Sequence, residues 1–325
     1  MIRRHVCEAV FRGVVSRCRP EHAVRSTLRA QPLHQVVYGI ALGDAALSMI
    51  RGAGPVLHGV AITRDDDRAH LPSGWHVVAP DETPELLILD IVASVREEAE
   101  LIVLLSGGAE QIVTPALSGG RLAELSSAPV RTLIASNLEG DALETLGGAP
   151  TVPVRSQDRA SVVVPRDAIV GALGRELGRH FSTSVRVGPQ VTTERVATKL
   201  VGDARSSLEP HYYFNQTRFE PPASAGAAGP AQLLALQLAL ELRGHDLSAF
   251  CAASTGWDGP ALVGHPRPAG AFVDGTTWDA MHAANLDPAG ALARHDAGPA
   301  LRAIGALVIT HFTGIDHGGD IVIVG

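Results

Sequence analysis

The run Val36-Val37-Tyr38-Gly39-Ile40-Ala41 passes through Gly43 into a helical stretch at residues 45–51. A β-rich apolar run that enters a helix through glycine is typical of the first βα unit of a doubly wound sheet. The same order recurs at residues 101–105, an apolar run that is consistent with a buried strand and ends at Ser106-Gly107-Gly108. Strands that alternate with helices in this way predict a parallel sheet covered by helices.

A second α/β domain is expected after a change of composition at residues 151–159, where proline occurs and no hydrophobic period is visible. Beyond this linker, apolar runs such as residues 249–254 alternate with helical patterns such as residues 230–242. We therefore expect an N-terminal domain of residues 1–155 and a C-terminal α/β domain of residues 156–325.

Composition indicates a globular protein with two domains and no nucleic-acid partner. Of the 325 residues, 46% are hydrophobic and 19% are charged, and the net charge is -7. No run rich in lysine or arginine carries the interleaved aromatic residues that track a phosphate backbone.

Neither a membrane span nor a leader is expected. No apolar run reaches the roughly 18 residues of a transmembrane helix, and Glu8 and Arg12 interrupt the apolar core that a signal peptide needs. The three cysteines do not suit a disulfide framework. These features favour a cytoplasmic protein with no membrane partner.

Lysine is almost absent from the chain. Of its 27 basic residues, only Lys199 is a lysine. Codon bias in a GC-rich genome accounts for the number, as the abundance of small residues also indicates. Arginine does not replace lysine as a proton-transfer group, so any mechanism that needs a lysine rests on Lys199.

Two glycine turns are candidates for binding an anion. The turn at Gly43-Asp44 precedes a helix and is able to present backbone amides to an anion, but Asp44 is equally suited to capping that helix. Ser106-Gly107-Gly108 is the better candidate for a phosphate loop, because ligands bind at the carboxyl ends of parallel strands. An ordinary strand-to-helix turn is the alternative there, since Glu110 adds a like charge.

Polar residues near the C-terminus allow a metal site or a simple capping loop. His311, Asp316 and His317 lie in one glycine-rich loop after a predicted strand, and their spacing matches no standard metal motif. Asp258 and Asp296 lie at the ends of predicted elements, where turn or cap residues are common.

Eight motifs, spread over nearly the whole chain, carry a resemblance to a known family. In chain order they lie at residues 39–49, 104–108 (LLSGG), 118–123 (SGGRLA), 136–141, 148–153 (GAPTVP), 256–260, 270–274 and 313–320. Together they resemble the glycerate 2-kinase family, whose C-terminal half is the MOFRL domain. The resemblance implies a Rossmann-like N-terminal domain, a MOFRL-like α/β C-terminal domain, and transfer of a phosphoryl group from ATP, with Mg, to the 2-hydroxyl of glycerate.

The turns and the motifs together give a set of candidate ligand-binding residues. They are Gly43, Ser106, Gly107, Gly108, Asp141, Asp258, Asp296, Thr313, Gly314 and Asp320.

Three positions of the resemblance carry a different charge in this chain. Asp44 stands at the family's lysine, Asn137 at its aspartate and Pro230 at its arginine. Phosphoryl transfer depends mostly on positioning and on neutralising charge, so each change affects what the resemblance implies for catalysis. Lys199 lies outside the motifs. The family's long helical segment in the first half is reduced here to residues 109–117.

These observations support two interpretations. The first is a pseudoenzyme, similar to a glycerate 2-kinase, that binds a small hydroxy acid, a nucleotide or a partner chain such as an intact family member. The second is an active ATP-dependent phosphotransferase of the glycerate 2-kinase type, or an altered enzyme acting on a related hydroxy acid. A homodimer is a further expectation.

Overall fold

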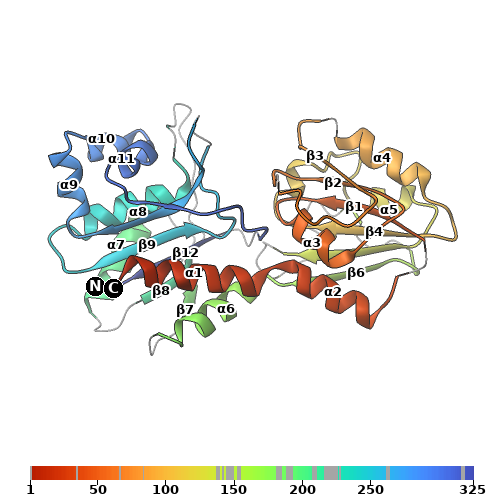
Figure 1. Ribbon diagram of the computed structural model, residues 1–325, viewed down its shortest axis with the longest axis horizontal. Coiled ribbons are helices and arrows are strands. Elements are labelled where there is room, and N and C mark those ends of the chain that lie inside the picture. Colours follow the sequence, from red (N-terminus) through yellow and green to blue (C-terminus); the bar gives the residue numbers. More distant parts are fainter. Residues whose placement is uncertain are drawn as a thin grey trace. The chain divides into compact units, whose positions relative to one another are not determined.

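The computed structural model forms two compact units, and each is built on a six-stranded sheet (Figure 1). Unit 1 consists of Met1–Arg17, Ile169–Thr313 and Gly319–Gly325, and unit 2 consists of Cys18–Ala168 and Gly314–Gly318. The structure describes residues 2–33, 36–65, 67–82, 84–136, 140, 143, 150–151, 155–180, 185–187, 193–206, 211–215, 226, 228–260, 264–315 and 319–325. No helix within these ranges has the length and apolar character needed to cross a membrane.

Unit 2 contains a parallel sheet with the strand order β3-β2-β1-β4-β5-β6. Its strands are β1 (Val37–Leu42), β2 (His58–Ile62), β3 (Trp75–Val78), β4 (Glu100–Leu105), β5 (Val130–Ala135) and β6 (Arg159–Val164). Its helices are α2 (Pro20–Ala30), α3 (Ala46–Ala53), α4 (Pro84–Ser94) and α5 (Arg121–Leu125), with the short 3-10 helix η1 (Ala109–Gln111). This is the order of a doubly wound sheet, in which ligands bind where the order reverses, here between β1 and β4.

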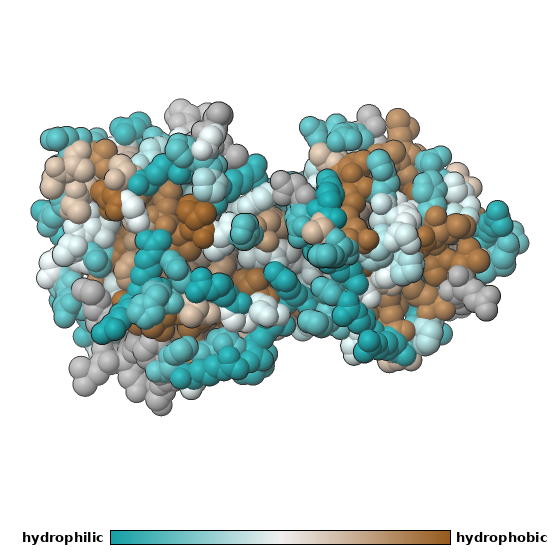
Figure 2. All heavy atoms as spheres, viewed as in Figure 1, coloured by the Kyte–Doolittle hydropathy of each residue, from teal (hydrophilic) through white to brown (hydrophobic). Residues whose placement is uncertain are grey.

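Alternate residues of the strands in unit 2 face two separate hydrophobic layers. In β1, Ile40 belongs to a buried cluster with α4, whereas Ala41 belongs to a second cluster with α2 and α3. Every residue of β1, β4 and β5 is buried, which is typical of strands covered on both faces. Val24 attaches α2 to the second cluster, and the side of α2 seen in Figure 2 is hydrophilic. The expected doubly wound parallel sheet is confirmed.

Unit 1 contains a mixed sheet with the strand order β11-β10-β9-β12-β8-β7. Its strands are β7 (Val185–Val187), β8 (His211–Asn215), β9 (Ser248–Ala253), β10 (Pro268–Asp274), β11 (Leu307–Ile309) and β12 (Asp320–Val324). Its helices are α1 (Arg4–Cys18), α6 (Ala168–Leu177), α7 (Thr193–Arg205), α8 (Pro230–Glu241), α9 (Thr277–Ala283), α10 (Pro288–Ala293) and α11 (Ala297–Ala303). β7 and β8 pair in parallel, and the remaining neighbours are antiparallel.

Both faces of the sheet in unit 1 are covered by helices. Ala249 and Cys251 of β9 belong to one buried cluster with α7 and α8. Phe250, between them in the strand, packs against Phe11 of α1, with the ring centroids 6.0 Å apart. The expected second α/β domain is confirmed, and the sequence did not predict strand β10.

The compact units differ from the expected division of the chain at residue 155. Strand β6 lies beyond that position and pairs with β5, so the parallel sheet continues past it. Helix α1 belongs to unit 1, because the amide of Ile2 donates to Ser248 Oγ (3.1 Å) and Arg4 Nη2 donates to Leu307 O (2.6 Å). Most of unit 2 is therefore enclosed in sequence by unit 1.

Candidate functional site

The turns that follow β1 and β4 lie against each other at the carboxyl ends of these strands. The amide of Asp44 donates to Gly107 O (2.8 Å), and the amide of Ala45 donates to Ser106 Oγ (2.9 Å). Ser106 Oγ donates in turn to Leu42 O (3.2 Å). The structure thus brings together four of the candidate ligand-binding residues, which are Gly43, Ser106, Gly107 and Gly108.

Glycine is required at position 43 by this close approach. Gly43 has φ of +102°, a conformation that residues with a side chain rarely adopt. A Cβ added there would lie 2.5 Å from Ser106 O and 2.6 Å from Gly107 O. The two turns pack this tightly only because position 43 carries no side chain.

The first amides of α3 are bound by the chain itself. Besides the bonds of Asp44 and Ala45, the amide of Ala46 donates to Gly43 O (3.2 Å). The N-cap residue of α3 is Ala45, and no side chain caps this helix. The prediction that Asp44 caps the helix is therefore wrong, because its carboxylate is bound elsewhere. The three amides at positions 44–46 all donate to acceptors within the chain.

Asp44 forms a bidentate pair with Arg64, which lies two residues beyond the end of β2. Asp44 Oδ1 accepts from Arg64 Nε (2.9 Å), and Asp44 Oδ2 accepts from Arg64 Nη2. The Asp44 side chain is 3% exposed, whereas that of Arg64 is 51% exposed. The negative charge at position 44 is thus neutralised by a cation whose other side reaches solvent.

Arg64 is not among the site residues that the sequence predicts. It follows the run of residues 56–62, which predicts a short strand, and β1 and β2 are neighbours in the sheet. The ends of two neighbouring parallel strands lie at the same edge, so a charged residue after one strand is able to meet one after the other. That rule would have pointed to the pair of Asp44 with Arg64.

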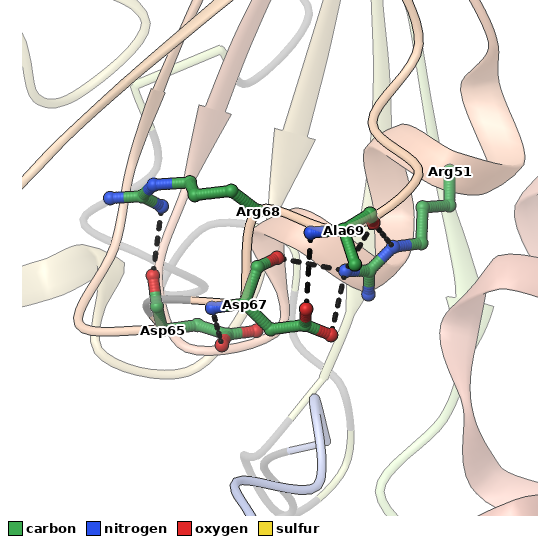
Figure 3. Close-up of polar contacts among 5 residues, drawn as sticks. All are labelled: Arg51, Asp65, Asp67, Arg68 and Ala69. Carbon is green, nitrogen blue, oxygen red and sulfur yellow. Dashed lines mark hydrogen bonds and ion pairs between the residues drawn. The ribbon is translucent and has the colours of Figure 1, made fainter.

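The loop that carries Arg64 is anchored to the end of α3 (Figure 3). Arg51 Nη2 donates to Asp67 O (2.8 Å) and pairs with Asp67 Oδ2 (2.9 Å), and its guanidinium also reaches Ala69 O. Within the loop, the amide of Asp67 donates to Asp65 Oδ1 (3.0 Å), and Arg68 Nη1 donates to Asp65 O (3.0 Å). These bonds restrict the position of the segment next to Arg64.

A small hollow lies at this edge of the sheet. Its volume is about 220 Å³, including space that is open to solvent. The lining residues are Gly43, Asp44, Thr63, Arg64, Pro80, Gly108, Gln111 and Ile112. Among these, Arg64 is the one cationic side chain and Asp44 the one acidic side chain. The amides of Gly107 and Gly108 donate to no acceptor in the described part of the chain.

The residues around this hollow do not fit a metal nucleotide as they stand. Polyphosphates are held by several backbone amides and a cation, and Mg²⁺ takes carboxylate oxygens as ligands. Here the amides of Asp44 and Ala45 are bound to the neighbouring turn. The Asp44 carboxylate accepts both of its bonds from Arg64. The hollow therefore suits a small anion better than it suits a magnesium ion.

In unit 1, the carboxylate of Asp258 is buried at the start of α8. Its Oδ1 accepts from the amide of Ala231 (3.1 Å), and its Oδ2 accepts from the amide of Gln232 (2.7 Å). Gln232 Nε2 donates back to Asp258 O (2.6 Å). Burial raises the pKa of Asp258 to about 6, although the amide bonds from Gln232 and Ala231 oppose that rise. The carboxylate caps α8 from a distant loop.

Trp257, next to Asp258, fixes this loop. Its ring lies 4.5 Å from that of Phe312, and the Arg267 guanidinium carbon lies 4.5 Å from the Trp257 ring centroid. Cation–π and aromatic contacts of this kind stabilise the loop against its neighbours. The indole is therefore in contact with the chain's own groups.

Other candidate residues of unit 1 occupy structural positions. Thr313 Oγ1 donates to Ser254 O (2.7 Å), and Asp320 begins β12. Asp296 precedes α11 without capping it through its side chain. Pro230 is the first residue of α8, so no charged side chain stands there. In unit 2, Gly314 has φ of +67° and lies against Ser48, where an added Cβ would be 3.3 Å from Ser48 Cβ.

The predicted metal site is described only in part. His311 is exposed, whereas Asp316 and His317 lie outside the described residues, as do Asn137 and Asp141. Among the residues that are described, no group of three or more His, Cys, Asp or Glu side chains is arranged to hold a metal ion.

Comparison with known families and proteins identifies relatives over nearly the whole chain. Residues 219–316 match the MOFRL family. A D-glycerate 2-kinase of Thermotoga maritima is 26% identical and aligns with 94% of this chain and 93% of its own length. A glycerate 2-kinase of Pyrococcus horikoshii is 24% identical, with 86% of this chain and 84% of the relative aligned.

The Thermotoga alignment runs over 400 positions, more than the 325 residues of this chain. The relative therefore contains residues that have no counterpart here.

Solved structures share the fold. The glycerate kinase of Thermotoga maritima superposes with a TM-score of 0.79 at 20% identity, covering 98% of each chain. A protein of Pyrococcus horikoshii superposes with a TM-score of 0.68 at 20% identity, covering 100% of this chain and 99% of the other. The expected two-domain α/β fold is confirmed by these likenesses.

Proposed function

This chain belongs to the glycerate 2-kinase family, with its MOFRL domain in the second half, and from that premise we propose that it binds a small anionic ligand without transferring a phosphoryl group. The ligand class is a small hydroxy acid or a phosphate-bearing molecule. A protein partner, either an intact family member or a second copy of this chain, is the alternative.

The observation that carries the proposal is that the chain's own oxygens bind helix amides next to its glycine-rich turns. In unit 2, the amides of Asp44 and Ala45 donate to Gly107 O and Ser106 Oγ. In unit 1, the first amides of α8 donate to the Asp258 carboxylate. Catalysis of phosphoryl transfer needs donors aimed at the charge that develops in the transition state. Donors that are already bound are poorly suited to that task.

The charge changes support the same conclusion. The resemblance places a lysine at position 44 and an arginine at position 230, where this chain has Asp44 and Pro230. Loss of one transition-state donor alone typically lowers kcat by about 10²–10³-fold, and two cations are missing here. We expect phosphoryl transfer by the family's route to be slower than a standard assay detects.

One observation favours an active enzyme as the second candidate. Arg64 neutralises Asp44 and brings a half-exposed guanidinium to the same edge of the sheet. In an active phosphotransferase, Arg64 would replace the missing lysine as the cation beside the phosphoryl group. The phosphate would then come from ATP, as the names of the relatives as kinases suggest.

Two measurements on the full chain separate these candidates. A coupled assay of ADP formation with D-glycerate and MgATP is expected to give no turnover. Separate calorimetric titrations with D-glycerate and with MgATP are expected to show heat of binding for at least one of them. Absence of binding in both titrations would contradict the proposal.

Turnover would favour the second candidate only if it depends on the site. Gly107→Trp fills the turn after β4, whereas Gly202→Trp adds the same side chain at an exposed position of α7 where nothing lies within 4 Å of the new Cβ. ADP formation that is lost in folded Gly107→Trp and retained in Gly202→Trp would establish the active enzyme.

A further inference from the structure

We propose that Arg64 binds the anionic group of the ligand at the hollow of unit 2, and that Asp44 is a positioning residue that holds its guanidinium in place. This inference rests on the proposed function, because it names the residue that supplies charge to the same site. Asp44 differs in charge from what the resemblance implies, since position 44 corresponds to a lysine there.

The first support is the geometry of the pair. Both oxygens of the Asp44 carboxylate accept from Arg64, and the Asp44 side chain is 3% exposed. A bidentate bond to a buried carboxylate fixes the plane of the guanidinium before a ligand arrives. The exposed half of Arg64 lines the hollow together with Gly108. Because Asp44 occupies the Nε and Nη2 edge, a carboxylate or a phosphate would be bound from the other side of the guanidinium, which carries Nη1.

The second support is the balance of charge around the hollow. Among the described residues that line it, Arg64 is the one cation and Asp44, which is paired with Arg64, is the one acid, while the amides at the start of α3 are bound to the turn after β4. Glu110, the like charge that the sequence placed near this turn, is exposed and does not line the hollow. An anion that enters therefore meets Arg64 as its main source of positive charge.

The third support is the anchoring of the segment that carries Arg64. Arg51 holds Asp67 and Ala69 through its guanidinium, and Asp65 Oδ1 accepts from the amide of Asp67 (Figure 3). Arg51 thus ties the backbone of residues 67–69 to α3, and Asp44 holds the side chain of Arg64. Rigid support of this kind is what a binding residue needs in order to discriminate between ligands.

The size of the hollow limits the ligand. The volume of about 220 Å³ includes space that is open to solvent, so the enclosed part of the hollow is small and receives only the anionic group of a ligand. A hydroxy-acid carboxylate and a free phosphate share the oxyanion that a guanidinium recognises. D-Glycerate and inorganic phosphate are therefore the two probes that distinguish the sources.

The test is calorimetric titration of the full chain with each probe, at low and at high salt. We expect the wild type to bind at least one probe, more weakly at high salt. We expect Arg64→Gln to raise its Kd at least about tenfold, which corresponds to about 1.4 kcal/mol. Arg96→Gln is the matched control, because Arg96 also lies in unit 2, is exposed, does not line the hollow and takes no part in anchoring the Arg64 segment. Its Kd is expected to equal that of the wild type.

A second variant keeps the test decisive if Arg64→Gln loses stability. Asp44→Asn with Arg64→Gln removes both charges together, so no buried carboxylate is left without a partner and the net charge is unchanged. We expect this paired variant to lose binding as Arg64→Gln does, because the guanidinium is missing. Arg64→Lys is expected to recover only part of the affinity, because an ammonium lacks the planar fork.

Two results would overturn the proposals, and they are distinguishable. Binding of the probe by the folded paired variant with the wild-type Kd would refute the role of Arg64 and leave the proposed function intact. A wild type that binds neither probe and does not bind MgATP would refute the proposed function and this inference together.

Discussion

Asp258 illustrates at the residue scale how burial and hydrogen bonding oppose each other. The carboxylate is removed from water, which raises its pKa to about 6, while the amides of Gln232 and Ala231 favour its charged form. The net result is a capping group that is less acidic than an exposed aspartate.

The stability of the protein is therefore expected to depend on pH through Asp258. Between the ordinary pKa of 3.8 and about 6, the folded state holds a proton that the unfolded state releases. The free energy of unfolding of the wild type should fall as pH rises through that window. Relative to Asp258→Asn, the fall should be about 3 kcal/mol. Urea unfolding of both proteins between pH 4 and pH 7 measures it, and parallel pH profiles would refute this expectation.

Gly43 gives a second prediction at the residue scale. Gly43→Ala should lower the free energy of unfolding by about 3 kcal/mol or more, because the new Cβ combines a positive φ with contacts to Ser106 O and Gly107 O. Gly119→Ala is the control, since Gly119 has φ of +59° and nothing within 4 Å of an added Cβ. It should lose only about 1–2 kcal/mol. Equal losses would mean that strain, and not the approach of the turns, dominates at position 43.

Some features of the site were predictable from sequence and others were not. The turns at Gly43 and Ser106 can be predicted from local sequence, because each follows an apolar run and contains glycine. The pair of Asp44 with Arg64 joins residues after different strands, and the cap that Asp258 provides joins a loop to a helix that begins 28 residues earlier. Local sequence patterns do not show contacts between distant residues. The sequence therefore revealed the negative charge of Asp44 but not its pairing with Arg64.

At the scale of elements, a buried ion pair joins β4 to β5. Arg131 Nε lies 2.7 Å from Glu100 Oε1, and the two side chains are 11% and 4% exposed. Arg131 Nη1 also donates to Gln31 O, at the end of α2. The arginine therefore attaches a helix as well as a neighbouring strand.

Removal of one partner of this ion pair should lower the free energy of unfolding more than removal of both partners. Arg131→Met leaves the buried charge of Glu100 without compensation, which typically costs about 3–5 kcal/mol. The double variant with Glu100→Met removes that charge and should recover most of the loss. Thermal or urea unfolding of the three proteins measures the difference. A double variant no more stable than Arg131→Met would show that the bond to Gln31 matters most.

The same scale explains where the expected division of the chain differed from the compact units. The composition at residues 151–159 suggested a linker, yet β6 follows directly and completes the parallel sheet. The domain to which a strand belongs depends on the strand with which it pairs. The hydrophobic pattern of the strand itself does not show which strand that is. The apolar period of α1 likewise predicted a helix without indicating which sheet it covers.

At the scale of the whole molecule, the first and last residues of the described chain meet at Ser248. Ser248 Oγ accepts from the amide of Ile2 (3.1 Å) and lies within donating distance of Ile2 O (3.0 Å), while Ser248 and Gly325 exchange two backbone bonds. These contacts hold α1 and β12 within unit 1.

Ser248→Ala should therefore destabilise unit 1 and leave unit 2 unchanged. Loss of the hydroxyl leaves a buried amide without its acceptor, at a cost of about 1–3 kcal/mol. Hydrogen exchange followed by mass spectrometry should show faster exchange in β9 and β12 than in the wild type, with β1 and β4 unchanged. Equal acceleration in all four strands would mean that the two units unfold as one.

The enclosure of unit 2 within unit 1 sets the order in which the molecule is able to fold during its synthesis. The parallel sheet is complete once residue 164 has been made, whereas β12, which lies between β9 and β8, is translated after the other described strands of unit 1. At ~5–20 residues per second, the roughly 300 residues between α1 and β12 take ~15–60 s to translate. During that interval, Phe11 and the other apolar residues of α1 have no complete sheet of unit 1 to pack against. Helix α1 is thus made before the parallel sheet of unit 2 but packs against its own sheet only after β12 has been made.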